Sequence, residues 1–402
     1  MSLDIMLPAL PDIGVALVSS SSNRAQLTIG AFLLGAAISS FVVGPVADRC
    51  GRRPPILCGL LVFVGASLLA PFAQSMEMML VLRFIQGAGA GTTRLSQAIL
   101  RDRYSGNEMA KAMSLVLMVF LIMPTLAPLM GQVILMVSGW RGVFFTMAVL
   151  GLVILVWTWW RLPETLAPAD RRPLSFRSVW AGLAIIAGDR SAIGYGIAAM
   201  LLLGTLYGFI ATAQPLYGQA YGLGGHFALA MAGTAVVQSI AAFACSRLIP
   251  SFGAQAVGIT ALTTHIAFAG MALIMLYLNL LPFWLLLLII TAMMAMFTWA
   301  DATLGALSMM NLGKIAGTAA SAFGAIQQLG ATLLGSLIGQ CYNGTPRALF
   351  WGSVILGAIA LGSAFLAGKI PNSVKRFQGL PSCNANHRPG VMPKASRKCR
   401  VR

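Results

Sequence analysis

Apolar runs of about 20 residues recur along almost the whole chain, and short polar stretches separate them. A helix rises about 1.5 Å per residue, so each run can cross a hydrocarbon core about 30 Å thick. The runs lack the alternation of a membrane β-barrel, so helices are the way to satisfy the backbone in lipid. The pattern predicts helices near residues 25–46, 54–74, 78–100, 109–135, 141–161, 191–213, 226–248, 254–278, 281–306, 313–340 and 347–368.

The first apolar stretch, Met1 to Leu10, is shorter than the others. Ten residues of helix span only about 15 Å, which is half of what a bilayer needs. We therefore expect the chain to begin in the middle of its first transmembrane helix. Either the true start lies upstream or the first helix is incomplete. The predicted fold is an all-α integral membrane protein of twelve helices whose first helix is N-terminally truncated.

Polar composition divides these helices into two sets of six. Residues 1–161 are predicted to form an N-terminal half, 162–190 a cytosolic linker rich in proline and charge, and 191–368 a C-terminal half. The tail, 369–402, holds nine Lys or Arg and no acid. We expect this tail to be disordered and to lie near anionic headgroups in the cytosol.

A weak internal repeat supports two halves. Gly44–Arg53 reads GPVADRCGRR between the second and third helices, and Ser246–Gln255 reads SRLIPSFGAQ at the same place in the second half. Gly253 stands where Gly51 does, whereas the aspartate and the arginine pair are missing. We interpret Gly44–Arg53 as a short polar loop on the cytosolic side. Two parallel six-helix halves are typical of secondary transporters that rock around a midplane site.

Composition narrows the class of protein. The 402 residues are 58% hydrophobic and 9% charged, and mean hydropathy is +0.83, whereas a soluble domain is about a quarter charged. The net charge of +17 is explained by Lys and Arg in cytosolic loops, so we expect no nucleic-acid partner. The six cysteines show no metal or redox spacing and imply no disulfide, and no removable signal peptide is indicated.

Four ionisable residues fall within predicted helices: Asp4, Arg83, Arg94 and Asp301. Each costs roughly 2.5–3.5 kcal/mol at the membrane centre unless it pairs or lines water. Arg83 and Arg94 are eleven residues apart, so a continuous helix would place both on one face with Gly87 between them. That face would suit a cavity wall. Alternatively, Arg83 reaches the outer surface and Arg94 pairs structurally.

Asp4 is a lone carboxylate in an apolar stretch. Burial favours the protonated form of such a group and a nearby arginine favours the ionised form, so Asp4 can load and release a proton as access changes. The alternative is a solvated acid near a frayed terminus. Asp301 is a second candidate for proton or substrate coupling on the same grounds, with fewer neighbouring motifs to support it. We interpret His265 as a hydrogen-bonded structural residue.

The fifth helix contains Pro124, Pro128 and Gly131 within MPTLAPLMG. The two prolines remove backbone donors and the small residues admit a neighbour, so we expect a bent, closely approached helix. Gly313 to Gly339 is also rich in small residues, with Gln327 and Gln328 as a polar pair, and is interpreted as a packing surface. No catalytic set, metal cluster or Walker motif is present in the sequence, so we predict no enzyme activity, no metal, no cofactor and no use of ATP.

Several motifs together resemble a known family. Gly44–Arg53 is similar to the signature loop of the major facilitator superfamily, and LVLRFIQGAG from Leu80 to Gly89 is similar to its fourth-helix motif. The stretches LDIMLPALP, RDRY, PTLAPLMG and GTAAS narrow the resemblance to Bcr/CflA drug:proton antiporters. The match covers about Ser2 to Gly368. The departures are Met6 in place of a usual tyrosine, Gln132 in place of a frequent glycine, and the missing half of the first helix.

The resemblance implies proton-driven export of hydrophobic or amphipathic drugs across the bacterial inner membrane by a multi-pass protein. It implies that Asp48, Arg49 and Arg52, with Gly44, Gly51 and Arg53 in the same stretch, form an inner gate. It further implies that Arg83 affects proton coupling, that Asp4 is a cavity carboxylate, and that Pro124, Pro128 and Gly131 belong to an antiporter helix.

The expected partners are a lipophilic small molecule, protons and membrane lipids, and the expected state is a monomer. Two alternatives stay open: a proton-coupled transporter of a small metabolite on the same fold, and a truncated remnant that transports nothing.

Overall fold

The structure is a computed structural model that describes residues 2–17, 22–104, 106–166, 171, 184, 186–223, 226–310 and 318–368. These residues are helical with short connections and contain no strand. Eight of their helices are long and apolar enough to cross a membrane. Met1–Lys369 forms one compact unit. The predicted basic tail and most of the predicted linker lie outside the described residues.

The N-terminal half contains the elements η1 (Asp4–Ala9), α1 (Leu10–Ala16), η2 (Ser22–Arg24), α2 (Leu27–Cys50), α3 (Arg53–Leu69), η3 (Ala70–Phe72), α4 (Met76–Gly91), η4 (Thr92–Arg94), α5 (Leu95–Arg103) and α6 (Gly106–Arg161). The C-terminal half contains α8 (Arg190–Gln214), the π-helical turn η6 (Pro215–Ala220), α9 (Phe227–Phe252), α10 (Ala254–Tyr277), α11 (Phe283–Met309), α12 (Thr318–Gln340) and α13 (Arg347–Gly368).

The predicted helices are present in the described residues, with three differences. The first helix continues past Leu10, because α1 extends it to Ala16. α2 continues to Cys50, so Gly44–Arg53 is the last turns of a helix and a tight turn rather than a loop. The 3₁₀ turn η4 interrupts the helix expected over 78–100. The fifth and sixth predicted helices, 109–135 and 141–161, are confirmed as the two parts of α6, which meet at Gly139, where the backbone is not helical.

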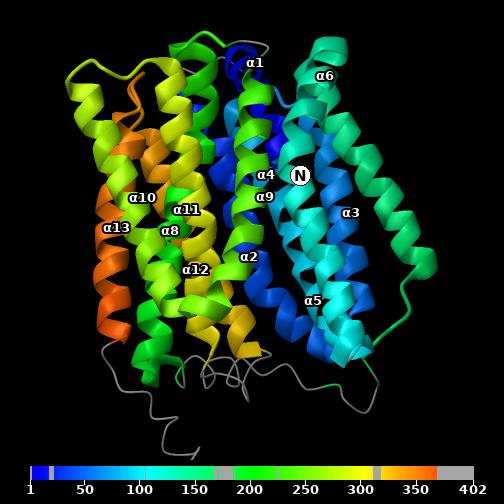
Figure 1. Cartoon of the computed structure of the whole chain (residues 1–402). Helices are drawn as coiled ribbons and strands as arrows, with labels where there is room; N and C mark the ends of the chain where they lie inside the picture. Colours follow the sequence, from blue (N-terminus) through cyan, green and yellow to red (C-terminus); the bar gives the residue numbers. More distant parts are fainter. Residues whose placement is uncertain are drawn as a thin grey trace, which may run out of the picture. The chain divides into compact units, whose positions relative to one another are not determined.

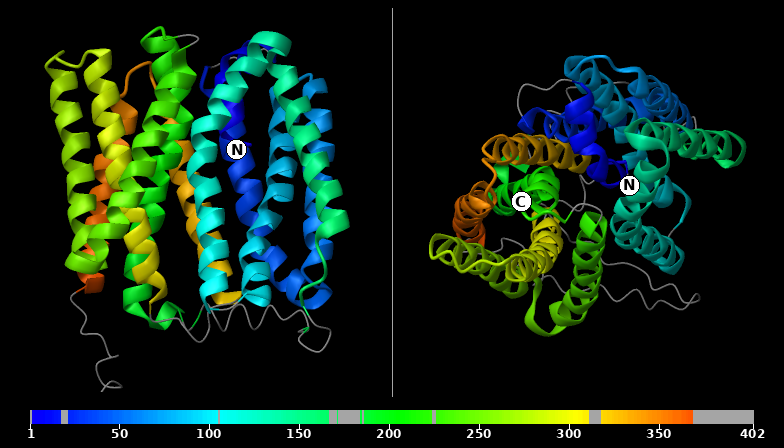
Figure 2. Two further views of the ribbon diagram at one scale, coloured as in Figure 1. Left: turned by 45° about the vertical axis from the view of Figure 1, so that its right-hand side comes forward. Right: turned by 90° about the horizontal axis from the view of Figure 1, so that it is seen from above.

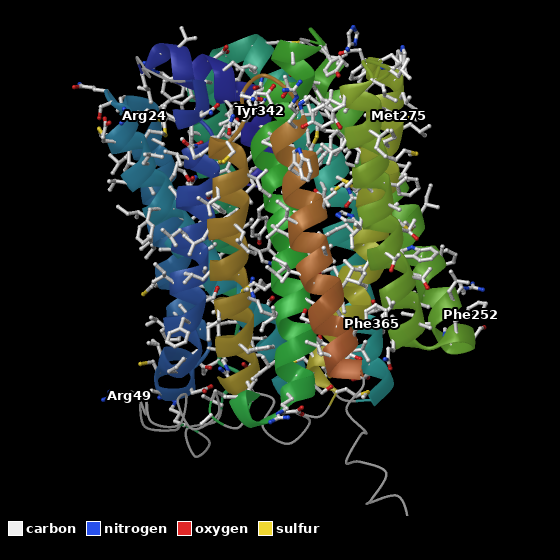
Figure 3. All side chains as sticks on the ribbon, turned by 90° about the vertical axis from the view of Figure 1, so that its left-hand side faces the viewer. Arg24, Arg49, Phe252, Met275, Tyr342 and Phe365 are labelled. Carbon is white, nitrogen blue, oxygen red and sulfur yellow. The ribbon has the colours of Figure 1, made fainter. Side chains whose placement is uncertain are left out.

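The two sets of helices lie beside each other (Figure 1), with the blue and cyan helices of the N-terminal half on one side. Across the boundary, α2 packs against α12, and α6 packs against α9. The view from above in Figure 2 shows the same division. We call the end that carries Arg24 and Tyr342 the outer end, and the end that carries Arg49 the inner end (Figure 3), following the positive-inside prediction.

The apolar core joins the two halves at the outer end. One cluster of buried side chains contains Ile29 and Met79 from the N-terminal half together with Phe209, Tyr217 and Phe350 from the C-terminal half. The other clusters among the described residues each draw on one half. The halves are therefore held together by shared apolar burial near the outer end, while their inner ends have separate cores.

Gly51 and Gly253 end α2 and α9 with the same backbone conformation. Their φ/ψ angles are 95°/168° and 80°/147°, which residues with a Cβ rarely adopt. Each preceding helix also contains a proline near its end, Pro45 and Pro250. The α2–α3 junction and the α9–α10 junction, which the internal repeat relates, are thus built in the same way.

Glycines allow α2 and α4 to approach at backbone distance. A Cβ on Gly87 would overlap the carbonyl oxygen of Phe32 in α2, and a Cβ on Gly35 would overlap that of Phe84 in α4. Close backbone approach at small residues is a main source of helix association in membranes, where lipid is as apolar as the side chains. This contact fixes α4, which carries Arg83, against α2.

We predict that Gly87→Val lowers the thermal unfolding midpoint of the purified protein, because the new side chain forces α2 and α4 apart at a cost of about 1–3 kcal/mol. Gly65→Ala in α3 is the matched control, since a Cβ there meets nothing within 4 Å. Thermal unfolding is followed in detergent. Equal unfolding midpoints for Gly87→Val and the control would contradict this packing.

Candidate functional site

Arg83 is the largest fully buried side chain of the described residues and lies in the outer part of α4. Its Nε donates to the carbonyl oxygen of Thr28 in α2 at 3.4 Å, and its Nη1 donates to Oε1 of Gln86 one turn later. Gln86 in turn donates from Nε2 to the hydroxyl of Ser67 in α3 at 2.6 Å. Three helices therefore converge on one guanidinium.

Aromatic rings complete the surroundings of Arg83. Its Cζ lies 4.6 Å from the ring centroid of Phe32 and 5.9 Å from that of Phe144, distances at which a cation is attracted to the ring face. No carboxylate pairs with Arg83 in the part of the chain that the structure describes, and its Nη2 has no hydrogen-bond partner. The guanidinium therefore keeps one donor group available for an acceptor.

The start of the chain reaches this network. The hydroxyl of Ser2 lies 3.6 Å from Sδ of Met147 in α6, and Nε2 of Gln86 lies 3.6 Å from the same sulfur. Asp4, the first residue of η1, is two positions from Ser2 and partly buried. The structure thus places Asp4 on the segment that lies against the Arg83 network.

The fifth transmembrane segment, the first part of α6, packs closely on η1. A Cβ on Gly131 would overlap the carbonyl oxygen of Ile5, so the close approach predicted for this helix is present. Pro128 is buried one turn earlier, whereas Pro124 is exposed. The small residues of this segment therefore position the stretch that carries Asp4.

Arg94 and Asp301 come from opposite halves and share a neighbour. Arg94 interacts electrostatically with Tyr207 of α8, and Tyr207 interacts with Asp301 of α11. Arg94 is exposed, and its Nη1 would lie 3.7 Å from a Cβ placed on Gly324 of α12. Because η4 is a 3₁₀ turn, counting 100° per residue from Arg83 does not hold as far as Arg94. The two arginines belong to two separate polar groups.

The charged stretch at the inner end of α2 forms a compact group. Asp48 Oδ1 accepts from Nη1 of Arg52 at 2.8 Å, with both side chains partly buried. Arg49 is exposed in the last turn of α2, and Gly44 lies one turn before Asp48. Arg53 donates from Nη2 to the carbonyl oxygen of Trp159 at 2.6 Å. The pairing of Asp48 with an arginine, expected for the gate, is therefore made within the N-terminal half.

Glu164 completes this group and was not among the residues singled out from the sequence. Its carboxylate accepts from the backbone amides of Arg52 and Arg53 at 2.7 Å and 3.2 Å, and from those of Thr165 and Leu166 at 3.0 Å and 3.1 Å. Burial alone would raise the pKa of Glu164, but these four backbone hydrogen bonds outweigh it and hold the pKa below its usual value. A Cβ on Gly51 would overlap this carboxylate, so the glycine makes room for it.

Glu164 acts at the start of α3 as a capping residue from a distant part of the chain. The first amides of a helix lack partners within the helix, and a carboxylate there also meets the positive end of the helix dipole. The sequence signal was the acid next to Pro163 in a cytosolic segment that otherwise carries several arginines. Nothing in the sequence showed that it would lie beside Gly51.

The predicted packing surface from Gly313 to Gly339 is described from residue 318 onward, and Gly313 and Gly317 lie outside the described residues.

Comparison with known proteins assigns the family. The sequence profile described as Major Facilitator Superfamily matches residues 1–335. The chain belongs to the Major Facilitator Superfamily. The bicyclomycin resistance protein homolog of Haemophilus influenzae is 28% identical over 354 residues, which cover 87% of this chain and 88% of that protein. Multidrug resistance protein MdtL of Salmonella heidelberg is 32% identical over 244 residues, covering 60% and 61%.

Solved structures show the same fold. The D-xylose-proton symporter aligns with a TM-score of 0.70 at 15% identity and covers 92% of this chain and 93% of its own. A bacterial homolog of the human lysosomal transporter Spinster, in an inward-facing and occupied conformation, aligns with a TM-score of 0.67 at 16% identity, covering 91% and 94%. These likenesses confirm the predicted major facilitator fold.

Membership of the Major Facilitator Superfamily makes the chain a membrane transporter rather than an enzyme. The bacterial relatives and the membrane-length helices make it a multi-pass protein of the bacterial inner membrane. Drug-resistance proteins among the relatives confirm the resemblance to Bcr/CflA-type antiporters.

We predict that Glu164→Ala lowers the stability of the N-terminal half by about 1 kcal/mol, the usual effect of losing a helix N-cap. Because the folded-state pKa is depressed, the stabilisation by Glu164 is present above the unfolded pKa and is lost as pH falls through the folded pKa. Thermal unfolding should be measured between pH 7 and pH 3. The unfolding midpoint of the parent should approach that of Glu164→Ala at low pH.

Glu77→Ala is the matched control for Glu164→Ala. Glu77 is an exposed carboxylate whose pairing with Arg24 spans 3.4 Å, and such surface pairs contribute little. A constant difference between parent and Glu164→Ala across this pH range would argue against the capping role of the ionised carboxylate.

Proposed function

We propose that this protein exports hydrophobic or amphipathic drugs across the bacterial inner membrane in exchange for protons, by alternating access. The observation that carries the proposal is the buried Arg83, which has neutral partners, an unpartnered Nη2 and the segment of Asp4 beside its network. A buried guanidinium is costly unless an anion or a strong acceptor approaches. Relatives that are drug-resistance proteins support the choice of substrate class.

In the proposed cycle, Asp4 carries the proton and Arg83 sets its affinity. When the protein opens outward, a proton from outside binds Asp4, which weakens the attraction of its carboxyl for the guanidinium and releases the drug. When it opens inward, the proton leaves to the cytosol and the ionised Asp4 is again attracted to Arg83. A drug then enters from the cytosol or the inner leaflet, and the proton gradient drives the net export.

A second candidate function has one observation in its favour. Arg94, Tyr207 and Asp301 place charge and hydrogen-bonding capacity from both halves around one point. Such a group suits a polar metabolite better than a lipophilic drug, because a site that offers hydrogen bonds and charge favours a ligand that can pair with them. Uptake or export of a small polar metabolite, coupled to protons through Asp4, is therefore the alternative on the same fold.

We predict that expression of the protein in an efflux-deficient bacterium raises resistance to lipophilic antibiotics at least severalfold and that Asp4→Asn abolishes the gain, because an amide does not exchange a proton. Asp12→Asn is the matched control, since Asp12 is exposed in the adjoining helix α1. The measurement is the minimum inhibitory concentration across a broad panel, with membrane levels of each variant verified.

Proteoliposomes separate the two candidate functions. Drug-dependent proton movement that Asp4→Asn removes supports efflux, whereas proton movement that responds to polar metabolites alone supports the alternative. Unchanged susceptibility to the whole panel by a membrane-inserted protein would count against drug export.

We predict that Asp48→Asn slows transport severalfold without abolishing drug binding, because Asp48 pairs with Arg52 far from the Arg83 network. The proposed role of Asp48, Arg49 and Arg52 is to stabilise the state in which the inner ends of the halves meet. Binding of a fluorescent drug and its initial transport rate should be measured on the same preparation. Loss of binding by a folded Asp48→Asn protein would contradict a gating role.

A further inference from the structure

A cluster of polar side chains joins the two halves at the outer end. The Nδ2 of Asn23, just before α2, donates to the carbonyl oxygens of Gln340 and Tyr342 at 3.1 Å and 2.8 Å. Gln340 donates from Nε2 to the carbonyl oxygen of Asn23 at 2.9 Å. The two acceptors lie at the C-terminal end of α12, where helix carbonyls lack partners within the helix. Asn23 therefore caps a helix that belongs to the other half.

Gln26 fixes the orientation of the Asn23 amide. Its Nε2 lies 3.4 Å from Oδ1 of Asn23, so the oxygen of this amide faces a donor while its nitrogen faces two carbonyl oxygens. The flipped amide would set oxygen against oxygen, and a carboxylate at this position would do the same. We call Asn23, Gln26, Gln340 and Tyr342 the outer clasp.

Small residues bring α2 and α12 together directly below the outer clasp. A Cβ on Gly30 would lie 3.6 Å from Cβ of Ser336, and a Cβ on Gly339 would lie 3.0 Å from Oε1 of Gln26. Figure 3 shows the gold ribbon of α12 beside the blue ribbon of α2, with Arg24 and Tyr342 near its upper end. The clasp thus closes the outer end of a tight contact between the halves.

The second contact between the halves, α6 against α9, lacks the polar bonds of the outer clasp in the described residues. α6 packs against α9, but among the residues whose side chains the structure describes, the hydrogen bonds between the halves all belong to the outer clasp. The apolar cluster at this end is shared by both contacts. In the described residues, the polar and directional part of the closure is therefore made by the outer clasp, and Asn23 takes part in each of its bonds between the halves.

We propose that Asn23 is a gating residue whose hydrogen bonds to the end of α12 hold the outer end closed and must break for it to open. This inference rests on the proposed alternating-access transport. Water replaces the broken bonds at the surface, so each contributes roughly threefold to the closing equilibrium. A contribution of this size favours the closed outer end without preventing the opening that a transport cycle requires.

The test uses a cysteine reporter below the clasp. Ser336→Cys is introduced into the full chain with its native cysteines replaced, because Cys341 is exposed at the same end. A membrane-impermeant maleimide added from outside should label this cysteine slowly in the parent, in proportion to the open fraction. We expect Asn23→Ala to raise the labelling rate about tenfold, and Gln340→Ala to raise it by less, because Asn23 makes two of the three bonds.

Asn343→Ala is the matched control. Asn343 is an exposed asparagine of the same loop, and its side chain accepts from Thr345 at 2.7 Å instead of crossing between the halves. It should leave the labelling rate within twofold of the parent. Labelling of Asn23→Ala at the parent rate, in protein whose unfolding midpoint matches the parent, would overturn the proposal.

A disulfide provides a second, independent measurement. The 3.6 Å separation at Gly30 and Ser336 lies within the range of disulfide Cβ atoms. The double variant Gly30→Cys with Ser336→Cys should therefore cross-link under mild oxidation and then resist labelling whether or not Asn23 is present. Failure of this pair to cross-link would show that the outer end is not closed and would overturn the clasp. A protein that labels as expected but moves neither drug nor protons would uphold the clasp and refute the proposed transport.

Discussion

The membrane interior offers no water to a guanidinium, and this constraint shapes the N-terminal half around Arg83. The side chain is fully buried, so its partners must come from the protein, and they come from α2 and, through Gln86, from α3. The helices approach closely because glycines meet backbone with no intervening side chain: Gly87 of α4 lies against α2, and Gly89 of α4 lies against α3. The small residues of these helices thus allow the Arg83 guanidinium to be buried between them. Arg83 keeps an unpartnered Nη2 even so, and on this incomplete pairing the proposed proton exchange of Asp4 depends.

The two ends of α2 are held in physically different ways. At the inner end, Asp48 and Glu164 bind the turn between α2 and α3 within one half, which ties these helices into a unit that can move as a body. At the outer end, Asn23 binds the other half through neutral hydrogen bonds near water. A charge network inside one half and exchangeable hydrogen bonds between halves suit a molecule in which the halves tilt while each keeps its internal packing.

The sequence predicted the helices well because membrane-length apolar runs have few other ways to satisfy their backbone. It also predicted the close approach at Gly131 and the equivalent glycines at 51 and 253, since small residues have local signatures. It did not predict that Asp48 and Arg49 belong to a helix, or that η4 breaks the register between Arg83 and Arg94, because short 3₁₀ turns and helix ends depend on neighbouring packing. Asn23 and Glu164 escaped notice because their partners are 319 and 112 positions away in the chain.

These contacts show how the two copies of the internal repeat differ in the groups that they contribute. The second half keeps the glycine at the α9–α10 turn but lacks the acid and the paired arginines, and it supplies helix-end carbonyls at the outer end where the first half supplies the asparagine. Two identical halves would offer the same groups at both of their contacts. Here the contact between α2 and α12 carries directional bonds, while the shared apolar cluster draws on residues of both α6 and α9, which pack together. In the proposed cycle, an interface with hydrogen bonds on one side and apolar packing on the other opens on the bonded side while the apolar side slides, so the separation of α2 and α12 would report opening.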